Sequence, residues 1–434
     1  MTPLLAGIIG IVVMLILILV LRVPICIAMA LPGMLGAIYL MGTDAAWAIL
    51  RIVPFSQTFN FVLTTIPMFV LMGEIIYFSG ISKELFSAFH KFLGQLPGGV
   101  AMATIAACGG FAAACGSSMA GAATMGSVAL PEMLKLKYDK GFASGTVAAG
   151  GTLGILIPPS TAFIIYGTLA EESIGKLFTA GIIPGIILVF LFIVTIYFRA
   201  VQNPKIAPRA AGVPWKEKIA SLKGVVAILI LFVVVIGGIY LGIFTPSEAG
   251  GTGACLAFVI ALAKRGLPRQ GFINALRVTL RTTCMIFAIL IGAMIFNYFL
   301  TVSRLPITLA DFTSSLPIPP LAIVACILLV YLMLGCVMDA LAMIIITIPI
   351  FLPTILALGF DKIWFGVLIV IMMETAFITP PIGMNCYVLS GVAPDVSLEE
   401  IFRGTATFLP ALVIAVLAAL FFPQLSLFLP GTMR

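Results

Sequence analysis

The sequence predicts an all-α polytopic membrane protein built from two repeats of inverted topology. Its composition is the first observation behind this prediction. Hydrophobic residues make up 62% of the chain and charged residues 9%, with a mean hydropathy of +1.26. Soluble domains carry about 25% charged residues. Many of the apolar stretches are long enough to cross the ~30 Å hydrocarbon core of a bilayer.

Two similar segments are the second observation. The first has a patch of small and polar residues, CGSSMAG at 115–121, followed by an apolar helix that Pro158-Pro159 interrupts. The second has GCVMDALA at 335–342, followed by a helix interrupted at Pro380-Pro381, about half a chain length later. Each segment predicts a re-entrant helical hairpin and a broken helix. Paired interruptions of this kind are typical of the binding region of secondary transporters, because hydrocarbon cannot satisfy the backbone groups that a break frees.

The pattern divides the chain into two repeats and a linker. We expect a first inverted repeat at 1–198, a basic cytoplasmic linker at 199–223 and a second inverted repeat at 224–434. The hairpins are expected at about 97–133 and 317–357, the broken helices at about 141–170 and 361–390, and the last span at 405–429. The first apolar stretch lacks a basic start and a small-residue cleavage site, so we interpret it as a retained helix.

Charge orients the predicted spans. In this topology all but five of the 23 lysines and arginines lie on one side, which the positive-inside rule makes cytoplasmic. The five exceptions are Arg51, Lys176, Arg304, Lys362 and Arg434. The net charge of +7 is therefore explained by orientation in a membrane and does not indicate nucleic-acid binding.

Oxygen-bearing residues in the first repeat suggest a cation site. Ser117 and Ser118 lie beside Gly116 at the predicted hairpin tip, and the break near Gly154 frees backbone carbonyls. Hard cations prefer oxygen ligands, so the tip and the break together could bind sodium. The alternative is that small residues here only allow close helix packing.

The second repeat contains carboxylates inside apolar sequence. Asp339 lies in the predicted hairpin, and an intramembrane carboxylate is functional by default. The alternative is a protonated Asp339 bonded to a neighbouring helix. Thr379 and Asn385 offer further oxygens near the break, and Glu374 is either a site acid or a helix cap. Glu74 is also intramembrane, but the sequence suggests no partner for it.

Several function classes are excluded. The chain has no Walker A motif for ATP hydrolysis and no evident nucleophile–base arrangement, so we expect no enzymatic activity. Its eight cysteines form no CxxC pair, which argues against disulfides and zinc. We expect no cofactor.

Four motifs give the chain a specific resemblance to a known family. The runs GSSMAGAATMGSVALPEM, GTLGILIPPSTAFIIYG, GIFTPSEAG and ITPPIGMN closely resemble the large membrane subunit, DctM, of tripartite ATP-independent periplasmic (TRAP) transporters. The resemblance implies a multi-pass protein of the bacterial inner membrane that takes up an organic acid by sodium symport. It also implies an elevator mechanism, a small four-helix membrane subunit and a periplasmic substrate-binding protein as partners, and sodium as the coupling ion.

The resemblance also implies site residues. One sodium ion would be held by Cys115, Ser117, Gly154, Ile157 and Pro159, and a second by Met338, Asp339, Ala376 and Thr379. The substrate would contact Ser118, Pro158, Ser160, Pro380 and Asn385. Cys115 stands where the family often has Ser, so its backbone carbonyl would serve, and Ala376 stands where Gly is usual.

A second interpretation stays open on sequence alone. Similar inverted hairpins occur in stand-alone ion-coupled carriers or exchangers of anions, which need no binding protein. The sequence does not name the substrate, because no arginine lies within the predicted cavity to bind a carboxylate.

Overall fold

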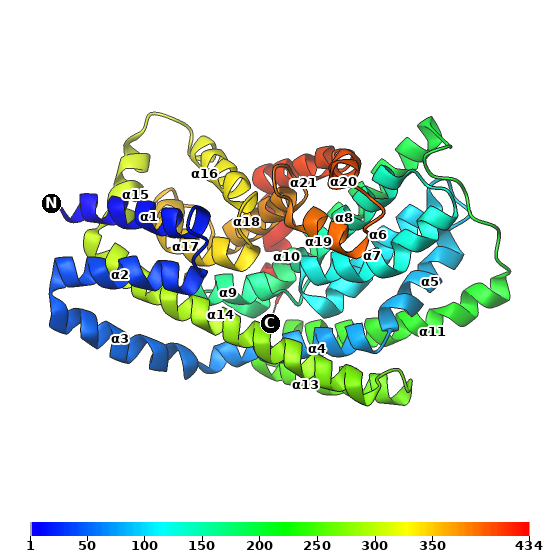
Figure 1. Ribbon diagram of the computed structural model, residues 1–434, viewed down its shortest axis with the longest axis horizontal. Helices are drawn as coiled ribbons and strands as arrows, with labels where there is room; N and C mark the ends of the chain where they lie inside the picture. Colours follow the sequence, from blue (N-terminus) through cyan, green and yellow to red (C-terminus); the bar gives the residue numbers. More distant parts are fainter. Residues whose placement is uncertain (1, 434) are drawn as a thin grey trace.

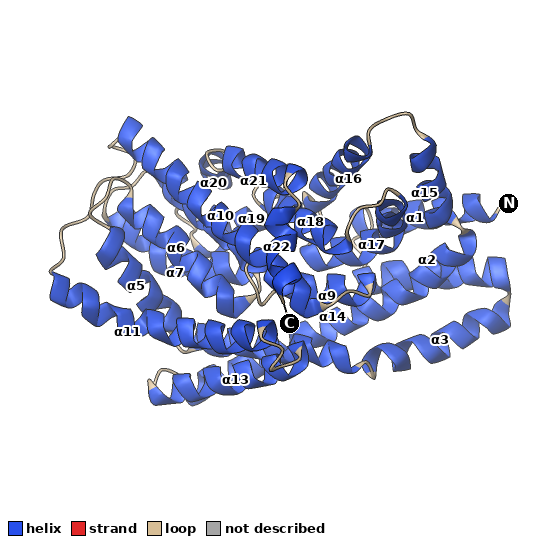
Figure 2. Ribbon diagram, turned by 180° about the vertical axis from the view of Figure 1, so that it is seen from behind, coloured by secondary structure: helices blue, strands red, loops and turns tan. Residues whose placement is uncertain are grey.

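The computed structural model describes residues 2–433, and this part of the chain is helical throughout, with no strand. The helices form two layers (Figures 1 and 2). One layer holds the long helices at the bottom of Figure 1, and the other holds the two hairpins and the broken helices. The predicted all-α class with two hairpins and two broken helices is confirmed.

The first half contains ten α-helices and one 3₁₀ turn, in chain order. They are α1 (Pro3–Leu19), α2 (Ile25–Met41), α3 (Thr43–Thr58), η1 (Phe61–Thr64), α4 (Thr65–Phe78), α5 (Ile81–Leu93), α6 (Gly99–Cys115), α7 (Ser118–Lys135), α8 (Lys140–Leu156), α9 (Thr161–Ala170) and α10 (Ile174–Gln202). Helices α6 and α7 form the first hairpin, and α8 and α9 are the two parts of the first broken helix.

The second half repeats this order. Its elements are α11 (Trp215–Phe232), the π-helical segment η2 (Val233–Gly237), α12 (Gly238–Tyr240), α13 (Pro246–Ala263), α14 (Arg269–Ser303), α15 (Leu305–Ser315), α16 (Pro320–Gly335), α17 (Ala340–Ala357), α18 (Lys362–Phe377), α19 (Met384–Val392), α20 (Leu398–Thr405), α21 (Leu409–Phe421) and α22 (Gln424–Thr432). The single long helix α14 takes the place of α3, η1 and α4. Helices α16 and α17 form the second hairpin, and α18 and α19 the second broken helix.

The long-helix layer is formed by helices of one half that pack against helices of the other half. Helix α2 packs along α14 of the other half, and α13 packs along α4. Helices α2 and α14 approach closely because Gly33 has no side chain: a Cβ there would lie 2.8 Å from the Cα of Phe296. Small residues allow such close helix packing in membranes, where apolar surface alone gives little driving force. This layer is therefore shared by both repeats.

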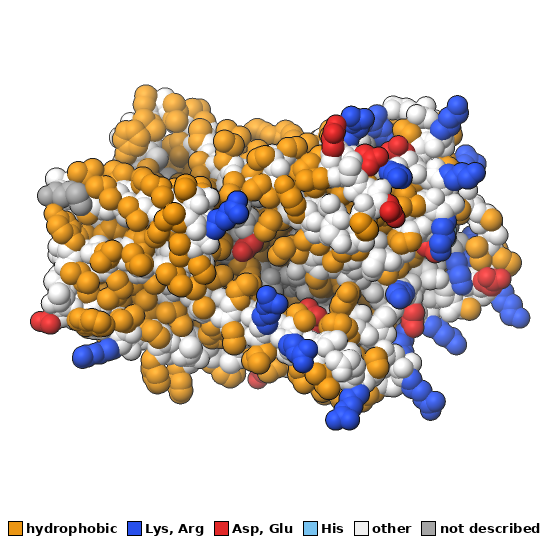
Figure 3. All heavy atoms as spheres, in the orientation of Figure 1, with side chains coloured by type: hydrophobic (Ala, Val, Ile, Leu, Met, Phe, Trp, Pro, Cys, Tyr) orange, Lys and Arg blue, Asp and Glu red, His pale blue; other side chains and the backbone are white. Residues whose placement is uncertain are grey.

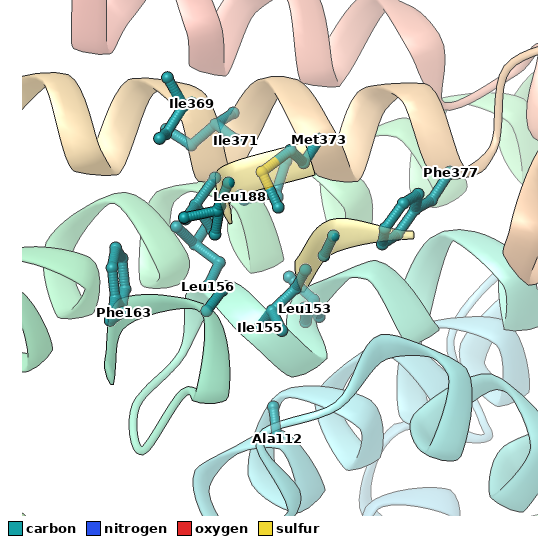
Figure 4. Close-up of a cluster of buried hydrophobic side chains, with 14 of the residues drawn as sticks. Ala112, Leu153, Ile155, Leu156, Phe163, Leu188, Ile369, Ile371, Met373 and Phe377 are labelled. Atoms are coloured by element: carbon teal, nitrogen blue, oxygen red, sulfur yellow. The ribbon is translucent and has the colours of Figure 1, made fainter. Parts of the chain in front are cut away.

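The second layer holds the two hairpins, which enter it from opposite ends. In Figure 1, α6 and α7 lie on the right, α16 and α17 lie on the left, and the broken helices lie between them. Side chains from α8, α9, α10 and α18 pack into a common apolar core, including Leu153, Phe163, Leu188 and Ile369 (Figure 4). The opposite directions of the hairpins are those expected for inverted repeats.

The surface of the molecule is that of a membrane protein. Seven helices in the described part of the chain are long and apolar enough to cross a bilayer, or eight if the bent pair α20–α21 counts as one span. Buried residues make up 78% of the most apolar stretch of Lys140–Ala170. They make up only 33% of the most apolar stretch of Trp215–Tyr240. Basic side chains gather at the right-hand end in Figure 3, over α5, α11 and α13, while the left-hand end is mostly hydrophobic.

Two boundaries differ from the sequence-based expectation. The expected last span at 405–429 is divided, because α21 ends at Phe421 and Pro423 precedes a separate helix, α22. The expected linker at 199–223 is largely helical: α10 continues to Gln202 and α11 begins at Trp215. The charged residues of this segment predict a loop, but Lys and Glu are also good helix formers and here extend the ends of α10 and α11.

Candidate functional site: two hairpin tips at one cavity

The first hairpin tip is a tight connection between two helices. Helix α6 ends at Cys115, and Gly116 adopts a left-handed conformation with φ of +64°, which favours glycine. Ser117 is the N-cap of α7, where its Oγ accepts a hydrogen bond from the Ala120 amide at 3.4 Å. The sequence Cys-Gly-Ser-Ser therefore ends one helix and starts the next within two residues.

The first broken helix holds this tip in place. Helix α8 ends at Leu156, and Ser160 caps α9 by accepting a hydrogen bond from the Phe163 amide at 3.4 Å. The Thr161 hydroxyl, just after the break, donates to the Gly116 carbonyl at 3.0 Å. A Cβ on Gly154 would lie only 2.5 Å from the Ser117 carbonyl oxygen, so the tip rests directly on the end of α8.

Four of the five residues predicted for the first sodium site therefore lie together. The Ser117 carbonyl packs against Gly154. The Pro159 carbonyl packs against Gly116, where a Cβ would lie 2.7 Å from the Pro159 oxygen. Cys115 is at the end of α6 beside them. The fifth, Ile157, is the C-cap of α8, and its side chain lies against Gly185 of α10.

The second tip and break repeat this arrangement. Asp339 is the N-cap of α17, and its Oδ1 accepts a hydrogen bond from the Ala342 amide at 2.9 Å. The Cys336 thiol donates to the Pro380 carbonyl at 3.5 Å, and the Thr379 hydroxyl to the Thr375 carbonyl at 2.6 Å. Asp339 thus bonds to its own helix rather than to a neighbouring one.

Ala376, where the family usually has Gly, packs against Gly335. A Cβ on Gly335 would lie 2.5 Å from the Ala376 methyl group. The missing side chain at Gly335 makes room for that methyl group, so the tip and the break still meet. Met338, the fourth residue predicted for this site, is buried beside Asp339.

The two tips meet at one cavity of about 190 Å³. Ser117, Ser118 and Asp339 line it from the hairpins, and Glu74 of α4 and Thr282 of α14 line it from the long-helix layer. The N-terminal ends of α7 and α17 both face it. The partial positive charge of these helix N-termini favours an anion, whereas the carboxyl groups of Glu74 and Asp339 in the same lining oppose one.

Four of the residues predicted to contact substrate lie away from this cavity. Pro158 and Ser160 are buried, Pro380 is exposed elsewhere, and the Asn385 amide donates to the Ala148 carbonyl at 3.3 Å. The buried Oδ1 of Asn385 has no hydrogen-bond partner. Only Ser118 lines the cavity in this conformation.

Two carboxylates lie where sequence reasoning did not place them. Glu74, which had no evident partner in the sequence, lines the cavity beside the first tip, where the adjacent Gly73 packs against Cys115. Of the two alternatives left open for Glu374, the helix cap is excluded, because the residue is fully buried in the interior of α18. Its Oε1 and Oε2 lie 2.9 and 3.0 Å from the Ser118 hydroxyl.

Known proteins share the sequence and the fold. Residues 12–425 match the family described as the tripartite ATP-independent periplasmic transporter, DctM component. The chain is 35% identical to the C4-dicarboxylate TRAP transporter large permease protein DctM of Pseudomonas aeruginosa, over 92% of this chain and 93% of that protein. It is 33% identical to the isethionate TRAP transporter permease protein DctMQ of Oleidesulfovibrio alaskensis, over 95% of this chain and 65% of that protein.

A solved structure has the same overall fold. The YdaH transporter of Alcanivorax borkumensis superposes with a TM-score of 0.63 at 14% identity, covering 99% of this chain and 98% of that one. The matched relatives are transporter permeases and not enzymes, in agreement with the sequence-based expectation. The chain is a multi-pass membrane protein and belongs to the DctM family, the large permease component of tripartite ATP-independent periplasmic transporters.

Proposed function

We propose that this chain takes up a small organic anion together with sodium across the bacterial inner membrane. The observation that carries the proposal is the cavity between the two hairpin tips, where each tip rests on a broken helix of its own half. Freed carbonyls and the Asp339 carboxylate supply the oxygen ligands that sodium prefers. The first site would use Cys115, Ser117, Gly154, Ile157 and Pro159, and the second Met338, Asp339, Ala376 and Thr379.

An organic acid is the substrate class that the cavity favours. The N-terminal ends of α7 and α17 and the hydroxyl of Thr282 can bind a carboxylate or a sulfonate, whereas the Ser118 hydroxyl donates to Glu374 in this conformation. The relatives named above transport a C4-dicarboxylate and isethionate, both of them organic anions. Sodium ions at the tips would offset the charge of the bound anion and of Asp339.

Two partner proteins complete the proposed transporter. Members of this family work with a periplasmic substrate-binding protein and a small membrane subunit, which here would have four helices. The DctMQ relative extends well beyond the region matched by this chain, consistent with a fused small subunit. The binding protein would select the substrate and deliver it to the cavity.

Uptake into proteoliposomes tests these partners. We expect accumulation of the organic acid only when this chain, its small subunit and the loaded binding protein are all present, with no effect of ATP. Equal uptake by this chain alone would instead identify a stand-alone carrier or exchanger.

The motion that we propose is an elevator movement of the hairpin layer against the long-helix layer. The division into two layers supports it, because the cavity is lined from both. The two tips lie in one packed layer, so they would travel together and expose the cavity to each side in turn.

Cross-linking tests this motion in a chain freed of its eight native cysteines. Cysteines at Met285 of α14 and Leu341 of α17, which line the same cavity, should react with a short thiol cross-linker in this state and not in the opposite one. A control pair at Ala30 and Ile291, which line one groove between α2 and α14, should react in both states. Unchanged cross-linking of the first pair through the transport cycle would favour local gating.

A further inference from the structure

The first hairpin tip is held by partners from both halves of the chain. Thr161 and Gly154, which hold Gly116 and Ser117, belong to the broken helix of the same half. Ser118, the next residue, donates to Glu374 in α18, a residue 256 positions away. The tip is therefore attached to the second broken helix as well as to the first.

The second tip has no equivalent attachment. Cys336 donates to Pro380 and Asp339 accepts from Ala342, and both partners lie in the second half. Between residues 2 and 433, the Ser118–Glu374 bond is the only side-chain hydrogen bond that joins a hairpin tip to a broken helix of the other half. The other hydrogen bond that the site contains between the halves, from Asn385 to Ala148, joins the two broken helices and does not involve a hairpin tip.

Both residues of this pair are buried, although Ser118 also borders the cavity. Glu374 is 0% exposed and Ser118 is 3% exposed. The hydroxyl has one proton, so it donates to one Glu374 oxygen at a time, with the Thr152 carbonyl as a weaker acceptor at 3.3 Å. Hydrogen bonds to carboxylates are strong in a low-dielectric interior, and losing one partner leaves the other costly to bury.

We propose that Glu374 is a positioning residue that couples the two candidate sodium sites. Ser118 follows Ser117 of the first site, and Glu374 precedes Ala376 of the second site by two residues. Ordering of one site by sodium fixes one end of the Ser118–Glu374 bond and thereby favours the geometry of the other site. The inference rests on the proposed sodium sites. Each site would affect sodium binding at the other equally, because coupling between two binding sites is reciprocal.

The sodium dependence of uptake tests the coupling in the complete transporter. The wild-type curve should be sigmoidal, with a Hill coefficient above one. Glu374→Ala and, independently, Ser118→Ala should lower that coefficient toward one and raise the half-saturating sodium concentration by roughly fivefold or more. Glu374→Gln keeps an acceptor oxygen for Ser118 and should restore most of the sigmoidal shape.

Thr124→Val is the matched control, because Thr124 is buried in the same hairpin and its hydroxyl donates only to Ala120 of its own helix. This variant should keep the wild-type Hill coefficient. A sigmoidal wild type with equally sigmoidal Glu374→Ala and Ser118→Ala variants would overturn the coupling, as would a hyperbolic wild-type curve. Sodium-independent uptake by the wild type would instead overturn the proposed sodium sites themselves.

Discussion

Replacing Asp339 by Ala is expected to reduce sodium-dependent uptake by about 100-fold or more while the complex still assembles. The carboxylate lines the cavity and is the one formal negative charge among the proposed sodium ligands. Removing one member of a charge pair in a low-dielectric site costs about 3 kcal/mol or more, and each 1.4 kcal/mol is a factor of ten. Initial uptake rates in proteoliposomes measure the effect.

The helix cap formed by Asp339 has to be separated from its proposed role in binding sodium. Asp339→Ala also removes the hydrogen bond to Ala342, which costs about 1 kcal/mol of helix stability. Asp339→Asn keeps a good N-cap and removes only the charge, so it should assemble like the wild type and still need much more sodium. Normal sodium affinity in Asp339→Asn would show that Asp339 acts as a cap alone.

Replacing Gly154 by Val is expected to abolish transport by displacing the first hairpin tip. Any Cβ at this position meets the Ser117 backbone, with 2.5 Å to its carbonyl oxygen and 2.8 Å to the Ser118 amide nitrogen. Backbone cannot rotate away as a flexible side chain can, so the tip has to move off the break and the first sodium site is lost. Overpacking of this kind typically costs about 1–3 kcal/mol, which a large membrane complex can tolerate.

Gly391→Ala provides the control for Gly154→Val. It lies in α19 of the second broken helix, and a Cβ there meets nothing within 4 Å. Its transport should be unchanged, because the added methyl group is free of clashes and alanine favours a helix. Wild-type sodium dependence in Gly154→Val would show that the tip does not have to rest on α8 for sodium binding.

The fold could be predicted from the sequence because its main features are local. Gly116 and Ser117 mark the turn of the first hairpin, and the proline pairs mark the breaks. Each feature depends on residues that are neighbours in the chain. The predicted ends of the hairpins differ from the observed ones by only a few residues.

The residues predicted for the sodium sites come from the family resemblance, and in the structure each tip rests on the break that comes next in the chain. Contacts across the halves could not be predicted in this way. No local pattern reveals that Ser118 faces Glu374, or that Glu74 shares a cavity with Asp339, because the packing of distant helices decides both. The capping role of Asp339 had a usable signal, an Asp directly before an apolar helical run.

Most of the predicted substrate contacts are residues at or just after the proline breaks, and in this structure those residues make other contacts. Ser160 caps a helix and Asn385 bonds to α8, so neither side chain reaches the cavity in this conformation. Their role as substrate contacts stays a prediction for another state of the transport cycle.

Sodium dependence of uptake tests the central claim most directly. Proteoliposomes with this chain, its small subunit and the loaded binding protein should accumulate the organic acid when an inward sodium gradient is imposed. A potassium gradient or a proton gradient of the same size should give no accumulation above that of empty liposomes. Equal accumulation with potassium or protons alone would contradict the assignment of sodium to the two hairpin tips.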